Sequence, residues 1–146
     1  MYKIILVSAL CCTLLFSCSK DKPLYSDVPE ITLVSASPSV VTEYKDSLVF
    51  VIQYQDGDGD LGEDSPSATN LFLTDNRIGI TYPFRIQQLA PTGSAVIIRG
   101  RLTVVLDHTG ITDGSSQQQA TFSIYVKDRA GHSSNSVTTG VIKVKK

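Results

Sequence analysis

The chain has 146 residues, of which 42% are hydrophobic and 18% charged, and its formal net charge is −1. This length supports one domain with an ordinary hydrophobic core and leaves little room for a second. The near-balance of charge excludes the basic stripe that nucleic-acid-binding proteins present, so no nucleic acid is expected as a partner.

The first seventeen residues have the pattern of a secretory signal peptide. Lys3 precedes an apolar stretch over residues 4–16, and the small residue Ser17 comes directly before Cys18. The apolar stretch is too short to span a bilayer comfortably, which favours a cleaved signal. Because Leu15 stands three positions before Cys18, the segment resembles the lipobox of bacterial lipoproteins. The resemblance implies cleavage before Cys18 and attachment of acyl chains, such as palmitate, to this cysteine.

The residues after the signal are predicted to form a tether. Residues 18–30 are largely polar and contain two prolines, so we expect a lipidated cysteine followed by a flexible coil. The three cysteines of the chain, Cys11, Cys12 and Cys18, all lie in the signal or at its edge. The folded part is therefore expected to have no disulfide bond and to depend on its core.

From residue 31 onward, hydrophobic side chains recur at every second position, which is the signature of half-buried strands. Turn-forming clusters separate these runs, and no stretch has a sustained helical period. Seven strands are predicted, near residues 31–36, 47–55, 69–74, 79–88, 96–106, 119–127 and 136–145. Three sets of side chains are expected in the core: Leu48, Phe50 and Ile52; Leu102, Val104 and Leu106; Phe122, Ile124 and Val126.

Seven short alternating strands within residues 31–146 predict an all-β domain. The pattern favours an Ig/fibronectin-like antiparallel β-sandwich of about seven strands. A small closed barrel is the alternative. The arginines at positions 77, 85, 99 and 101 are scattered over strands and turns, and we expect them on solvated faces.

An acidic loop follows the second predicted strand. Residues 56–64 hold five of the fourteen acidic residues and no cation. The alternating glycines allow the loop to curl, so that Asp56, Asp58 and Asp60 face one point. Oxygen ligands at alternate positions suit a hard cation, and Ca²⁺ is the first candidate. The alternative is a solvated acidic turn in which the glycines only make the bend.

This loop departs from an EF-hand at two positions. The sixth position is Leu61, where an EF-hand has glycine, and the twelfth is Ser67, where an EF-hand has a bidentate glutamate. No helices are predicted on either side of the loop. An EF-hand is therefore excluded, although the Asp-x-Asp-x-Asp spacing remains that of a calcium loop.

A second candidate loop lies between the last two predicted strands. Residues 128–135 begin Asp-Arg-Ala-Gly and resemble the Asp-x-Ala-Gly-Asn-x-Ser turn of many bacterial Ig-like domains. In a sandwich of that type this loop and the acidic loop emerge at the same end. Asp128 is therefore a candidate fourth metal ligand. The alternative is that Asp128 only caps its own turn.

Together, the lipobox, residues 54–62, residues 70–77 and the turn at 128–131 resemble small surface lipoproteins of the Bacteroidetes type. The resemblance implies a protein held on the outer membrane by its lipid anchor. Ser19 follows Cys18 in place of the aspartate that typically retains lipoproteins in the inner membrane. Whether the domain faces the periplasm or the cell surface stays open.

The sequence lacks the familiar catalytic motifs of hydrolases, zinc proteases and nucleotide-binding enzymes. His108 and His132, the two histidines of the chain, are expected in loops at opposite ends of the sandwich. We therefore expect a non-enzymatic binding or structural module, with a glycan or a surface protein as partner. One alternative is a carbohydrate-binding accessory protein of a polysaccharide-uptake system. Another alternative is a glycoside-active enzyme that uses Asp58 and Asp60 as paired carboxylates.

Overall fold

Alternating side chains build ten strands within residues 25–146, the part of the chain that the computed structural model describes. The predictions for the signal peptide, for Cys18 and for the first part of the tether lie outside these residues. No helix in the described part is long and apolar enough to cross a membrane.

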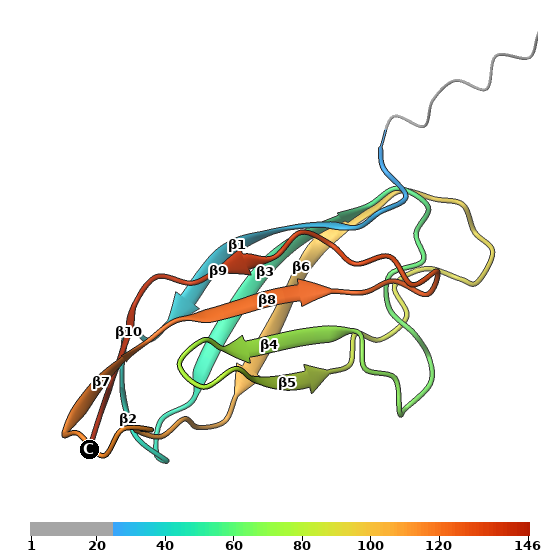
Figure 1. Cartoon of the computed structure of the whole chain (residues 1–146). Coiled ribbons are helices and arrows are strands. Elements are labelled where there is room, and N and C mark those ends of the chain that lie inside the picture. Colours follow the sequence, from blue (N-terminus) through green and yellow to red (C-terminus); the bar gives the residue numbers. More distant parts are fainter. Residues whose placement is uncertain (1–24) are drawn as a thin grey trace, which may run out of the picture.

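The strands form two facing layers, with a smaller sheet at one end (Figure 1). In the first layer the order is β1 (Glu30–Ser37), β3 (Leu48–Asp56) and β6 (Ile98–Leu106). In the second layer it is β5 (Ile80–Phe84), β4 (Leu71–Asp75), β8 (Phe122–Val126) and β9 (Val137–Thr138). The smaller sheet orders β2 (Val40–Thr42), β10 (Ile142–Lys145) and β7 (Gln117–Ala120). Every pairing is antiparallel except that of β2 with β10.

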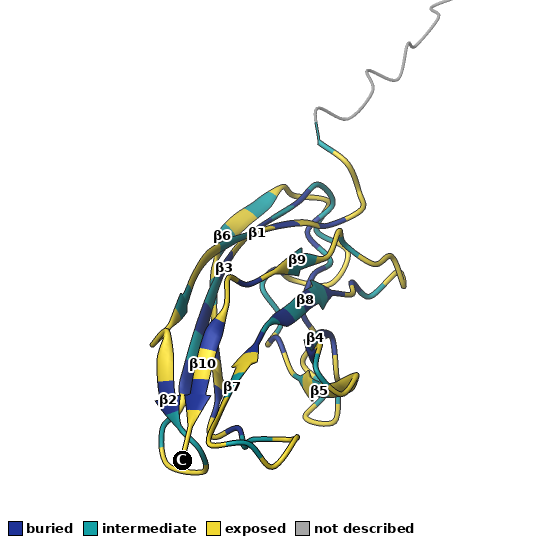
Figure 2. Cartoon of the chain, turned by 60° about the vertical axis from the view of Figure 1, so that its left-hand side comes forward, coloured by how far each residue is buried: buried dark blue, intermediate teal, exposed yellow. Residues whose placement is uncertain are grey.

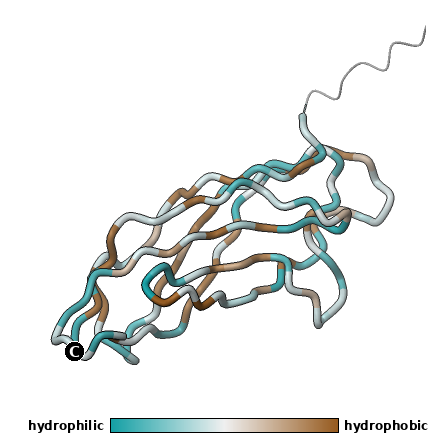
Figure 3. Tube along the Cα trace, in the orientation of Figure 1, coloured by the Kyte–Doolittle hydropathy of each residue, from teal (hydrophilic) through white to brown (hydrophobic). Residues whose placement is uncertain are grey.

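The core lies between the two layers. Phe50 of β3 meets Phe122 of β8 edge to face, with ring centroids 5.4 Å apart at an interplanar angle of 63°. Buried positions alternate with more exposed ones along β3, β4 and β8 (Figure 2). Hydrophobic residues accordingly lie along the strands, whereas hydrophilic ones dominate the turns (Figure 3). Of the nine side chains predicted in the core, eight are buried, and Leu102 is half-buried against the cluster.

Over residues 25–146 the structure confirms an all-β fold arranged as a β-sandwich. Its sheets are separate and not closed into one barrel. The Ig/fibronectin type of the sandwich stays a prediction. The expected seven strands become ten because two long strands are each interrupted and β2 was not predicted.

Side chains cause two of the differences from the predicted strands. The predicted strand 79–88 ends as β5 at Phe84, because the Asn70 side chain takes over the backbone groups of Ile86. The Asn70 carboxamide oxygen accepts from the Ile86 N–H at 2.5 Å, and its amide nitrogen donates to the Ile86 carbonyl at 3.2 Å. The predicted strand 119–127 divides into β7 and β8 at residue 121, where the Phe122 N–H donates to the Thr139 hydroxyl at 3.0 Å.

The expectation that Arg77 lies on a solvated face is wrong. Its side chain is only 8% exposed and pairs with Asp75, which is 1% exposed. The guanidinium also donates to the Gly110 carbonyl and to the Gln118 and Thr109 side chains. This ion pair fixes the turn after β4, at the end of the sandwich opposite the acidic loop.

The contact between the two layers is tested by replacing Phe122 with alanine. This change removes the ring that packs on Phe50 and should lower the free energy of unfolding by ~3–5 kcal/mol. The matched control is Val105→Ala on β6, since Val105 is 44% exposed and its truncation should cost less than ~0.5 kcal/mol. Urea denaturation of both variants measures the two values. Equal losses would contradict the assignment of the buried faces.

Candidate functional site

The acidic loop begins on the last residue of β3 and folds back into the molecule. Asp56 closes the strand and is 0% exposed. Five residues later, Leu61 is also 0% exposed and belongs to the hydrophobic core. The Leu61 N–H donates to the Asp56 carboxylate oxygen Oδ2 at 2.9 Å. The buried leucine thus draws the loop over the end of the sandwich and holds the Asp56 carboxylate inside it.

Backbone atoms of three other segments lie very close to the glycines of this loop. A Cβ added at Gly57 would lie 2.4 Å from the Ser26 carbonyl oxygen. At Gly59 it would lie 2.4 Å from the Val96 carbonyl oxygen, and at Gly62 2.3 Å from the carbonyl oxygen of Gln87. Gly59 and Gly62 also have positive φ angles of 77° and 85°, which favour glycine. The glycines therefore allow the loop both to curl and to pack closely against the surrounding backbone.

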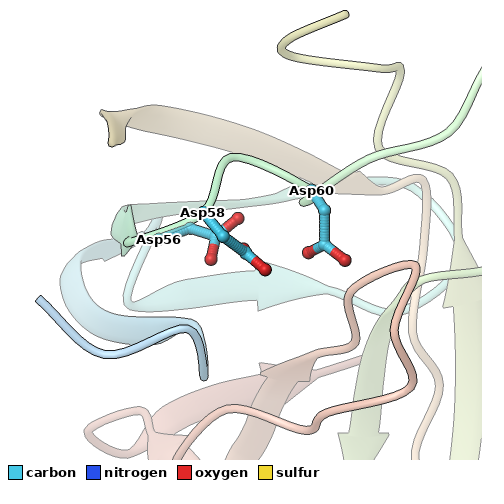
Figure 4. A group of neighbouring side chains, drawn as sticks. All are labelled: Asp56, Asp58 and Asp60. Carbon is cyan, nitrogen blue, oxygen red and sulfur yellow. The ribbon is translucent and has the colours of Figure 1, made fainter. Parts of the chain in front are cut away.

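The three predicted carboxylates converge on one point. Each of Asp56, Asp58 and Asp60 offers an oxygen, and these three oxygens lie within 4.8 Å of one another. The three side chains gather on one side of the loop that follows β3 (Figure 4). One oxygen of each carboxylate, Oδ1, is buried and has no hydrogen-bond partner among residues 25–146. Buried polar atoms are rarely left unpaired in native proteins, so this arrangement needs an explanation.

The electrostatics of the loop disfavour three negative charges. Burial raises the pKa of Asp56 to about 6, and the charges of Asp58 and Asp60 add to that effect, whereas the hydrogen bond from Leu61 opposes it. Burial also raises the pKa of Asp60, assisted by the charges of Asp128 and Asp58. Without a cation, the folded loop therefore holds carboxylates that would gain a proton more easily than in water.

The spacing of the carboxylates is compatible with ligation of one divalent cation. Ca²⁺ binds oxygen at about 2.3–2.6 Å, so oxygens on one ion lie at most about 5 Å apart. Mg²⁺ binds at about 2.0–2.1 Å, which limits that separation to roughly 4.2 Å. The three carboxylate oxygens all lie within 4.8 Å of one another, which one bound cation can span, and the choice of Ca²⁺ over Mg²⁺ stays a prediction. Three carboxylates leave further positions for water or for another ligand.

The second candidate loop meets the first, as expected. The Ala130 N–H donates to Oδ2 of Asp60 at 2.9 Å, and the Arg129 guanidinium donates to the Gly62 carbonyl at 2.6 Å. These contacts join residues 128–135 to the acidic loop. They also give Asp60 an orientation that its own loop does not supply.

Asp128 is engaged within its own turn. It is 7% exposed, and its two carboxylate oxygens contact the backbone N–H of His132 at 2.7 Å and the Nδ1 of His132 at 3.0 Å. It is not one of the three carboxylates that converge, yet its charge acts on Asp60. The turn-capping alternative thus has direct contacts in its favour, and a ligand role for Asp128 stays a prediction.

An open cavity gives access to the carboxylates. It has a volume of about 200 Å³ and is lined by Asp58, Asp60, Arg129 and residues 93–95. A cation can therefore reach the two less buried carboxylates from solvent. Asp56 lies behind them as the innermost group.

Sequence reasoning missed two residues that shape this site. Leu61 appeared only as a departure from the EF-hand pattern, although a lone leucine among acidic residues is a signal for an anchor in the core. Arg129 was part of a recognised turn, but nothing in the sequence indicates that its guanidinium reaches the carbonyl of Gly62.

Comparisons with protein-family models, with curated proteins and with solved structures found no match for this chain. The function of the site is therefore inferred from the positions and burial of the residues that form it.

The raised pKa of Asp56 predicts how the stability of the metal-free domain depends on pH. The carboxyl binds its proton more tightly in the folded state, with a pKa of about 6, than in the unfolded state, where it is about 3.9. Its contribution to stability is therefore complete below about pH 4 and is lost as the pH rises through 6. Between pH 5 and 7 the free energy of unfolding should fall by about 1 kcal/mol from this group.

Urea denaturation after removal of metal tests this dependence. Asp56→Asn should flatten the profile between pH 5 and 7, because the carboxamide does not titrate. Asp107→Asn is the control, since Asp107 is exposed and lies away from the loop. A wild-type profile that rises over this interval, with no change in Asp56→Asn, would contradict the burial of the Asp56 charge.

Proposed function

We propose that this protein is a non-enzymatic, lipid-anchored binding or structural module of the outer membrane, whose loop end is stabilised by Ca²⁺. The observation that carries the metal site is the set of three buried carboxylate oxygens without partners, on Asp56, Asp58 and Asp60. Asp56 matters most, because it is 0% exposed and its free oxygen cannot be satisfied by bulk water.

A bound cation changes the energetic balance of the enclosed loop. A buried acceptor without a partner costs ~1–3 kcal/mol, and more when it is charged. Three such oxygens would strongly destabilise the enclosed conformation, which Leu61 and the glycine contacts nevertheless hold. A divalent cation accepts all three as ligands and neutralises most of the charge. This explanation accounts for both the convergence and the missing hydrogen bonds.

The described chain enters the domain at the end that carries the candidate metal site. The described chain begins at Tyr25, beside the acidic loop, and the C-terminus lies at the opposite end (Figure 1). An anchor at Cys18, seven residues before Tyr25, would hold the acidic end toward the membrane. The opposite end would then face outward and be available to a surface-protein partner.

A carbohydrate-binding accessory protein is the second candidate, and one surface feature favours it. Phe72 of β4 and Tyr125 of β8 stack on the outer face of the second layer, with ring centroids 4.8 Å apart and an interplanar angle of 15°. Hydroxyls on the same face form the pairs Thr74 with Thr81 and Ser123 with Thr138. Aromatic rings beside neutral hydroxyls suit a neutral glycan. Calcium-independent glycan binding that Tyr125→Ala abolishes would favour this candidate.

Calcium should stabilise the wild-type domain. If Kd lies at roughly 10⁻⁴–10⁻³ M, as in extracellular modules, about 10 mM Ca²⁺ adds ~1–3 kcal/mol to the free energy of unfolding. The melting temperature should rise by several degrees and return on chelation. Asp58→Asn should remove most of this rise, because it deletes a ligand while also relieving repulsion in the metal-free loop.

Two further variants define the ligand set. Asp64→Asn is the matched control, because Asp64 lies in the same loop but is exposed and outside the convergent group. It should keep the wild-type rise. Asp128→Asn should weaken the rise only if Asp128 contributes to the site. Identical melting curves with and without Ca²⁺ would remove the metal site and leave a solvated acidic turn.

Lipidation at Cys18 is a separate prediction. Cys18→Ala should give a protein that is either uncleaved or free in the periplasm, because no acyl chain can be attached. More than one acyl chain is expected on the wild type, since a single chain holds a protein only marginally. Membrane fractionation of wild type and variant is the measurement. A variant that remains with the outer membrane as the wild type does would rule out this anchor.

A further inference from the structure

The chain that enters the sandwich rests on the acidic loop. We call residues 25–29 the entry segment. The guanidinium carbon of Arg99 on β6 lies 4.2 Å from the centroid of the Tyr25 ring, a cation–π contact. The Gly57 N–H donates to the Ser26 carbonyl at 3.0 Å. Gly57 stands between Asp56 and Asp58, so the entry segment is bonded to the peptide that separates two candidate ligands.

The fit between the entry segment and Gly57 leaves no free space. A Cβ at Gly57 would lie 2.4 Å from the Ser26 carbonyl oxygen and 2.9 Å from that of Tyr25. A shift of the Gly57 peptide toward the segment would therefore produce a clash, and a shift away would break the hydrogen bond. The segment is therefore docked closely against residues 56–58 in the path that brings their carboxylates together.

The second loop of the site also holds the incoming chain. The Asn135 side chain accepts from the Ile31 N–H at 2.9 Å and donates to the Ile31 carbonyl at 2.8 Å. Asn135 ends the turn that begins at Asp128, and Ala130 of this turn bonds Asp60. Both loops that carry candidate ligands thus contact the first residues of the domain.

We infer that cation binding in the acidic loop and docking of the entry segment are coupled, so that occupancy of the site fixes how the domain is held relative to its N-terminal anchor. The inference rests on the proposed function and names the element that the metal site controls. A bound cation holds Asp56 and Asp58 together and positions the Gly57 N–H for Ser26. Without it, mutual repulsion between the carboxylates of Asp56 and Asp58 disfavours this path of the backbone and weakens the contact with Ser26. Because coupling is reciprocal, the docked segment must also raise the affinity for the cation.

The absence of tryptophan from the chain makes a direct probe available. Tyr25→Trp introduces a single tryptophan, which can be excited apart from the tyrosines, and preserves the aromatic face toward Arg99. In the full chain in detergent, adding Ca²⁺ should raise the anisotropy of this tryptophan and shift its emission to the blue. The same probe combined with Asp58→Asn should show neither change, which excludes an effect of Ca²⁺ on the detergent.

Reciprocal coupling can be tested through the affinity for Ca²⁺, because coupling and simple electrostatics predict changes in opposite directions. Arg99→Ala removes a positive charge near the acidic loop, so electrostatics alone predicts tighter Ca²⁺ binding. Coupling predicts weaker binding, by about two- to fivefold for the loss of an exposed cation–π contact. Tyr25→Ala should weaken binding to a similar extent without any change of charge. Arg101→Ala, exposed on the same strand two residues further on, is the control and should not weaken it.

The outcomes distinguish this inference from the proposed metal site. Weaker Ca²⁺ binding in Arg99→Ala and Tyr25→Ala, together with a probe that responds to Ca²⁺, supports the coupling. If Ca²⁺ stabilises the wild type but both variants bind it with wild-type affinity and the probe is silent, the coupling is overturned and the metal site stands. If Ca²⁺ has no effect on the wild type, both are overturned.

Discussion

The acidic end of this protein depends on one apolar anchor. Leu61 sits in the core with no exposed surface, although it is surrounded in sequence by glycine, aspartate and glutamate. An acidic loop left to itself would extend into solvent, where its charges repel least. Burial of the leucine, which is worth ~1.5–3 kcal/mol, turns the loop back. Its backbone N–H then holds Asp56 in a buried position.

The remainder of the site follows from that fold-back. Once Asp56 is enclosed, the glycines bring the loop against three other backbone segments, and the carboxylates of Asp58 and Asp60 have little freedom to separate. Residues 128–135 close over the loop through Arg129 and Ala130. The result is a set of converging negative charges held by contacts that are themselves uncharged or cationic. A proton on Asp56 or, as we propose, a bound divalent cation offsets the repulsion within this set.

The strands were predictable because their signal is local. Alternation along Leu48–Asp56 and Phe122–Val126 identifies strand and buried face together. The points at which the strands are interrupted were not predictable, since they depend on side chains that are distant in sequence. The Asn70 side chain accepts from the Ile86 N–H, and the Thr139 hydroxyl accepts from the Phe122 N–H. The convergence of the three aspartates could be predicted from their spacing. Their burial was not predicted, because it follows from the inward orientation of Leu61, and the signal that this leucine gives among acidic residues was missed.

The behaviour of Asp128 and Arg77 shows the same limit. The sequence placed Asp128 near the acidic loop, and the loops do meet, but its oxygens are already engaged by His132. Arg77 was expected on a solvated face, yet it is enclosed with Asp75. For both residues the type of side chain indicated a charged group, whereas tertiary contacts determined which groups this side chain binds.

Calcium titration of the metal-free protein by isothermal calorimetry tests the central claim most directly. The proposed function predicts one Ca²⁺ bound per chain in the wild type and none in Asp56→Asn. The Asp64→Asn control should retain the wild-type stoichiometry. Absence of binding in the wild type, or unchanged binding in Asp56→Asn, would contradict a calcium site built on the buried carboxylates.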